Sequence, residues 1–153
     1  MLASSFFREW ELVRSGTLAC APLIPDDRLD FRPQPDLMEL GELTRHINGA
    51  VYYMLKHVMG LSLEIPLKIR KKEPLNAAEF QEALRSTDEH VRRFLTDLNP
   101  EDLEKTVPRA QKSGKNWTIG YLVWHLQEHE IHHRAQLKLY LKLLGKDTSG
   151  LPF

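Results

Sequence analysis

Four of the seven histidines, His125, His129, His132 and His133, lie within one stretch of nine residues. His129 and His133 are four residues apart, so on a helix their Cβ atoms lie about 5–6 Å apart on one face. Two imidazoles at this spacing can bind one ion, and neutral imidazole nitrogen suits Zn, Ni, Fe or Cu at about 2 Å. Catalytic sites of this kind hold three protein ligands and keep an open position. The pair therefore predicts a metal site whose third ligand comes from another part of the chain.

The third ligand has three candidates elsewhere in the sequence. His46 and His57 fall on the second predicted helix, and His90 falls on the third. We favour His46 because Ala50, one helical turn further on, leaves room beside it. The helical pattern ranks His57 only slightly lower, so it leaves that alternative open.

The same stretch also contains a short match to a zinc-protease motif. His129, Glu130 and His133 satisfy H-E-x-x-H, in which the glutamate is the general base. Those enzymes need a third ligand, yet no His or Glu follows His133. The extended form of the motif also fails, because its glycine and last histidine would fall at Gln136 and Leu139. We therefore disfavour a protease.

Several polar residues close to the predicted ligands have two readings. Glu130 falls within the apolar arc of its helix, where a carboxylate is costly unless it is paired. It is our candidate catalytic residue, as a general base or as a group that orients a ligand; pairing with Arg134 or a charge at a dimer interface is the alternative. Gln136 and His125 flank the ligand pair and are candidates for contacts to a ligand or substrate. Tyr53 could donate to an oxyanion, or could simply pack.

The hydrophobic spacing is helical throughout, and it predicts an all-α fold. The expected helices cover about residues 3–20, 36–59, 76–98 and 117–144. Asp36 with Glu39, and Asn76 with Glu79, are capping-box patterns, while Gly145 marks a helix end. The connections 60–75 and 99–116 are long enough to contain short helical pieces. These lengths predict a single four-helix-bundle domain over residues 1–153, with up-down-down-up or a related topology.

The composition excludes several classes of protein. Lys and Arg number 21 and Asp and Glu also number 21, so no global field favours nucleic acid or an anionic membrane. Cys20 is the only cysteine, so no internal disulfide can form. Charged residues including Arg8 and Arg14 interrupt the first twenty positions, which argues against a signal peptide or a spanning segment. We expect a cytoplasmic protein with no nucleic-acid or membrane partner.

Two runs of the sequence resemble the DinB family, also called DinB/YfiT-like. TIGYLVWHLQEHEIHHRAQLKLYLKLLG resembles the family's helix with H-x-x-H-H-R-G-Q, and DDRLDFRPQPDLMELGELTRHI is similar to its lead into the first metal histidine. The resemblance implies a four-helix bundle, commonly dimeric, in which His46, His129 and His133 hold one divalent metal ion. Ala135 stands where the family often has Gly.

The resemblance also implies a class of function. The family includes thiol S-transferases and a thiol-dependent isomerase that use low-molecular-weight bacterial thiols. We therefore expect a homodimeric enzyme in which a Zn, Ni or similar ion lowers the pKa of a thiol cofactor that attacks a small-molecule substrate. A metal-dependent hydrolase with the same ligands is the first alternative. A non-catalytic metal-binding stress-response protein is the second.

Overall fold

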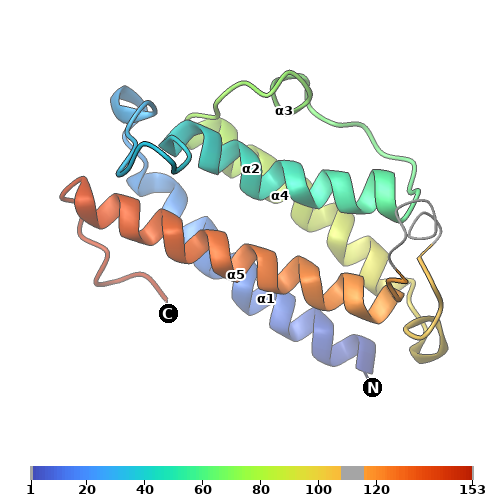
Figure 1. Ribbon diagram of the computed structural model, residues 1–153. Coiled ribbons are helices and arrows are strands. Elements are labelled where there is room, and N and C mark those ends of the chain that lie inside the picture. The colour runs from blue at the N-terminus through green and yellow to red at the C-terminus, as the bar shows by residue number, and fades with distance from the viewer. Residues whose placement is uncertain (1, 108–115, 153) are drawn as a thin grey trace.

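The structure, a computed structural model, describes residues 2–107 and 116–152. In these residues the chain forms five α-helices, four of them long and one of a single turn (Figure 1): α1 (Leu2–Cys20), α2 (Leu40–Tyr53), α3 (Leu67–Arg70), α4 (Ala77–Thr96) and α5 (Ile119–Leu143). A π-helical turn, Met54–Val58, continues α2, and 3-10 turns occupy Ala21–Leu23, Asp26–Arg28 and Pro100–Asp102. The predicted all-α class is confirmed. None of the helices in the described ranges is long and apolar enough to cross a membrane.

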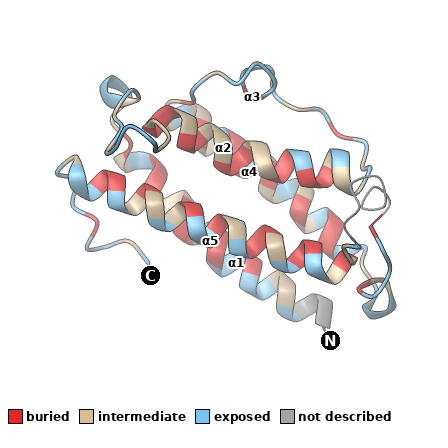
Figure 2. Cartoon of the chain, viewed as in Figure 1, coloured by how far each residue is buried: buried red, intermediate tan, exposed pale blue. Residues whose placement is uncertain are grey.

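The four long helices pack as a bundle in which each one contacts two others. Helix α1 packs against α4 and α5, and α2 packs against the same two helices. The colours of Figure 1 show that α1 and α5 run in one direction, while α2 and α4 run in the other. Figure 2 shows buried residues along the inner sides of all four helices. The two helices that carry the predicted metal ligands, α2 and α5, are therefore neighbours.

The observed start of α4 agrees with the sequence prediction, whereas the observed start of α2 differs from it. Asn76 caps α4 by accepting a hydrogen bond from the Glu79 amide at 2.9 Å, as predicted. The prediction that Asp36 begins the second helix is wrong, because α2 begins at Leu40 and its capping box is formed by Glu39 and Glu42. The amides of Leu40 and the residue after it donate instead to carbonyls of the preceding loop, at Phe31 and Leu29. This docking of the loop on the first turn of α2 delays the helix by four residues relative to Asp36.

The other helix ends agree with the sequence pattern. The π-helical turn carries the second helix to Val58, and Gly60 then adopts a positive φ of 78°. Thr118 caps α5 by accepting from the Tyr121 amide, and Gly145 follows its end with a φ of 76°. The predicted short helical pieces are α3 and the turn Pro100–Asp102, while residues 108–115 of the second connection lie outside the described part.

Candidate metal centre

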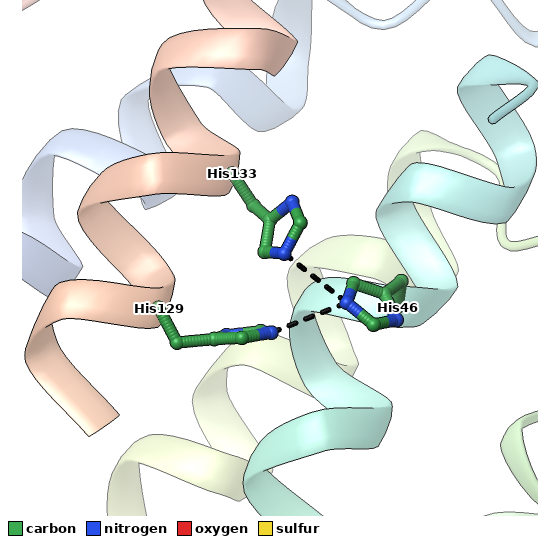
Figure 3. A group of neighbouring side chains, drawn as sticks. All are labelled: His46, His129 and His133. Atoms are coloured by element: carbon green, nitrogen blue, oxygen red, sulfur yellow. Dashed lines mark hydrogen bonds between the residues drawn. The ribbon is translucent and has the colours of Figure 1, made fainter. Parts of the chain in front are cut away.

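Three imidazoles from two helices meet between α2 and α5. His46 lies near the middle of α2, and His129 and His133 lie on successive turns of α5 (Figure 3). The two side chains from α5 point toward His46 in this view. Because α2 and α5 pack side by side, the i, i+4 pair on one helix faces the single histidine of the other.

Two of the three separations among the imidazoles fit one bound metal ion. His46 Nε2 lies 3.1 Å from His133 Nε2 and 3.2 Å from His129 Nε2. The ligand atoms of all three residues lie within 4.8 Å of one another. An ion about 2.0–2.1 Å from two nitrogens separates them by roughly 2.9 Å at a right angle and roughly 3.4 Å at the tetrahedral angle. The separations of 3.1 and 3.2 Å lie between these limits, so the group could hold a metal.

Hydrogen bonding within the protein explains this cluster poorly. Each neutral imidazole nitrogen carries either a proton or a lone pair, so His46 Nε2 cannot donate to one neighbour and accept from the other. His133 Nδ1 lies 2.7 Å from Gln136 Oε1 and donates to it, which leaves the lone pair of His133 on Nε2. This arrangement, in which one nitrogen is held by a neighbour and the other is free to ligate, is typical of metal-binding histidines.

Burial favours the neutral form of all three imidazoles, because it lowers the pKa of each. Burial, with a smaller contribution from the nearby His133, lowers the pKa of His46 to about 4. Burial also lowers the pKa of His129 to about 3, with the neighbouring His133 and His46 acting in the same direction. The pKa of His133, which is 9 % exposed, is lowered by burial as well. At neutral pH the ligand nitrogens therefore need not lose a proton before binding an ion.

We compared the sequence with models of known protein families. A model of the DinB superfamily matches residues 9–137, a range that contains all three histidines. The chain belongs to the DinB superfamily.

Relatives of this DinB superfamily chain cover nearly its full length. The Bacillus subtilis (strain 168) protein named "Uncharacterized protein YjoA" is 24% identical over 140 residues, which are 92% of this chain and 88% of that protein. A crystal structure of a DinB-like protein from Bacillus cereus ATCC 10987 has a TM-score of 0.80 and 20% identity, covering 98% of this chain and 95% of its own. The crystal structure of YjoA has a TM-score of 0.74 and 21% identity, covering 97% and 96%. These likenesses establish the fold.

The structure separates Glu130 from the histidine cluster. Its side chain is fully buried and lies 2.8 Å from Arg14 of α1, on the side of α5 that faces the bundle core. Burial raises the pKa of Glu130, and the adjacent Arg14 opposes that shift. Arg134, the partner that the sequence suggested, donates instead to the Val13 carbonyl. The catalytic role of Glu130 stays a prediction.

Some of the other residues singled out from the sequence lie next to the three histidines, and the rest are not part of the cluster. Gln136 contacts His133 as described. The centre of the His125 ring lies 6.3 Å from that of the His129 ring, and His125 Nδ1 pairs with Glu128. Tyr53 is 59% exposed and packs against His57. Neither His57 nor His90 belongs to the group of possible ligands found among the described residues.

The sequence did not lead us to predict a role for Arg14, which we noted only as one of the charges that interrupt the N-terminal segment. The side chain is 1% exposed and packs over the Trp10 ring at 4.6 Å. A signal was present, because Arg14 lies four residues after Trp10 and three before Thr17, in the apolar stripe of α1. A charge in that stripe requires a buried partner.

Proposed function

We propose that His46, His129 and His133 hold one divalent ion, Zn²⁺, Ni²⁺ or similar, and that the protein is a metal-dependent enzyme. The observation that carries this proposal is the convergence of three imidazole Nε2 atoms, to which the part of the chain that the structure describes adds no fourth His, Cys, Asp or Glu ligand. Three protein ligands with open positions are the arrangement of catalytic sites, whereas structural sites are closed by protein groups. A bound ion supplies Lewis acidity, which lowers the pKa of a thiol or water molecule.

The residues around the cluster support binding of the ion, and the protein's own cysteine is unsuited to act as the nucleophile. Gln136 holds His133 in the tautomer that presents Nε2. Cys20 is 1% exposed, and burial raises its pKa to about 11, so the protein's own thiol stays protonated and inaccessible. We therefore propose a low-molecular-weight thiol as cofactor, a small electrophile as substrate, and a reaction of the thiol S-transferase or thiol-dependent isomerase type. A reducing, cytoplasmic location completes this proposal, since it keeps such thiols reduced.

The first experiment measures metal content. Untagged wild-type protein should hold near-stoichiometric metal, and His129→Ala and His133→Ala should each lose it while remaining folded by circular dichroism. His57→Ala is the matched control, because His57 is exposed and lies outside the cluster. A folded wild type that takes up no Zn²⁺ or Ni²⁺ on incubation would refute the site.

The second experiment separates the classes of function. Metal-loaded protein is incubated with a panel of thiols and an electrophile, and product formation is compared with that of His129→Ala. Metal-dependent consumption of thiol supports the proposal. Hydrolysis of ester or amide substrates without thiol would instead support the hydrolase, and metal binding without turnover would support a binding protein.

We also propose that the protein is a homodimer joined through the outward side of α5. Trp124, Ile131 and Leu139 are 50, 44 and 53% exposed there, and the small Ala135 lies on the same side. Grouped exposed apolar side chains of this size are typical of protein–protein contacts. A small residue among them lets a partner helix approach closely.

A further inference from the structure

A chain of buried polar side chains crosses the bundle core and includes one residue from each long helix. We name Arg14 (α1), Asn48 (α2), Thr87 (α4) and Glu130 (α5) the polar belt. Their exposed fractions are 1% for Arg14 and 0% for the other three. The surrounding core is otherwise mainly aliphatic and aromatic, so these groups meet each other rather than water.

The contacts of the polar belt are continuous from α5 to α2. Arg14 Nη2 lies 2.8 Å from Glu130 Oε2, and Arg14 Nη1 donates to Thr87 Oγ1 at 3.1 Å. Thr87 Oγ1 lies 3.1 Å from Asn48 Oδ1, and its one proton is shared among that oxygen and the carbonyls of Ala83, at 2.9 Å, and Leu84, at 3.2 Å. Arg14 Nη1 is further held by the Leu84 carbonyl at 3.3 Å. The belt therefore links α5 to α2 through side chains of α1 and α4.

Both ends of the polar belt lie next to metal-ligand candidates in the sequence. Glu130 directly follows His129 and precedes His133 by three residues, and Asn48 follows His46 by two. Successive helical residues differ by about 100° around the axis, so Glu130 faces the core while His129 faces α2. A rotation of α5 that moved the histidines away from His46 would also pull the Glu130 carboxylate away from Arg14.

Stability alone is a weak reason for such an arrangement. Removing two charges from water costs several kcal/mol per ion, and well-packed apolar replacements of buried pairs are often neutral or stabilising. Burial lowers the pKa of Arg14 and raises that of Glu130, which shows the desolvation cost on both partners. A metal site, by contrast, needs its ligands held within about 0.5 Å and 10–20° of the binding geometry.

We infer that the polar belt positions the metal centre by fixing the rotation and register of α5 against α2, so that the three Nε2 atoms converge. Arg14, Thr87, Asn48 and Glu130 then act as positioning residues, through the helices that carry His46, His129 and His133. This inference rests on the proposed metal site.

The test replaces the ion pair by apolar side chains of similar size, in the double variant Arg14→Met/Glu130→Leu. We expect the metal-free variant to melt at the wild-type temperature or above, yet to bind Zn²⁺ at least about tenfold more weakly, the lower end of the range for groups that orient ligands. Its Co²⁺ absorption spectrum should also change, because that spectrum reports coordination geometry. A folded double variant with wild-type Zn²⁺ affinity and Co²⁺ spectrum would overturn the inference.

Two further variants keep the test decisive. Arg93→Met/Glu89→Leu removes an exposed ion pair of 3.0 Å on α4 and should change neither readout. Thr87→Val keeps the size of the side chain and cuts the link between Arg14 and Asn48, so it should weaken Zn²⁺ binding in the same direction. If the double variant does not fold, unchanged Zn²⁺ affinity in Thr87→Val overturns the inference.

A metal-independent readout separates this inference from the proposed function. The His46 ring centre lies 4.5 Å from that of His133 and 5.1 Å from that of His129, so nuclear Overhauser effects between these rings are expected in metal-free protein at neutral pH. The belt variants should lose them. If the wild type binds no metal, and the belt variants lose the nuclear Overhauser effects that the wild type shows, the proposed function fails while the positioning role stands. If the effects persist in folded belt variants, the positioning role fails.

Discussion

Lowering the pH from 7 to 5 tests whether the protein holds its metal-ligand candidates without protons. A proton and a metal ion compete for the same imidazole lone pair, so metal affinity falls wherever a ligand histidine becomes protonated. Burial and neighbouring imidazoles lower the pKa of His46 to about 4 and that of His129 to about 3. We therefore expect apparent Zn²⁺ affinity to depend only weakly on pH in this interval.

The expected size of the effect follows from these pKa values. Two histidines with an ordinary pKa of about 6.5 would each weaken binding about 25-fold between pH 7 and 5, or about 600-fold together. A pKa of about 4 leaves roughly nine-tenths of His46 neutral at pH 5, and a pKa of about 3 leaves nearly all of His129 neutral. Only His133 then contributes appreciably, and its pKa is also lowered. The total loss should stay below about 25-fold.

The assay is competition for Zn²⁺ with a chromophoric chelator whose own pH dependence has been calibrated. Circular dichroism at each pH checks that the protein stays folded, and His57→Ala should give the wild-type curve because His57 lies outside the cluster. A loss of several hundred-fold in folded protein would refute the reasoning, since it would show imidazoles that titrate as they do in water.

Three further predictions concern the same site and its surroundings. Gln136→Ala should weaken Zn²⁺ binding by about tenfold, measured by chelator competition, because His133 loses the acceptor that fixes its tautomer; an unchanged affinity would contradict that role. Metal-free protein should lose stability as the pH falls from about 6.5 toward 4, because unfolded histidines take up protons in that window while folded His46 and His129 do not. Thermal melts with and without Zn²⁺ measure this loss, and a melting temperature of the metal-free protein that is constant over the window would count against it. Ile131→Glu should convert a dimer to a monomer by light scattering coupled to size-exclusion chromatography, whereas Glu89→Gln on α4 should not; a wild type that is monomeric at high concentration would exclude the dimer.

Local sequence patterns predicted those parts of the fold that depend on neighbouring residues. Asn76 and Glu79 form their capping box within four residues, so the sequence around them is enough to predict the start of α4. His129 and His133 share a face because both lie on one helix, and the period of that helix is visible in its apolar residues. Asp36 failed as a helix start because the loop at Leu29 and Phe31 takes up the first amides of α2, a contact that no local pattern reports.

The tertiary structure decided which helix faces meet. Helical periodicity left His46 and His57 as alternative third ligands, and only the packing of α2 on α5 brings His46 Nε2 to 3.1 and 3.2 Å from the other two imidazoles. The partner of Glu130 was likewise beyond local reasoning, because Arg14 lies on another helix and becomes its neighbour only when α1 packs against α5. A single sequence determines which residues share a side of one helix, since that depends on 3.6 residues per turn. It leaves open which sides pack together, since that depends on the shape and burial of every helix at once.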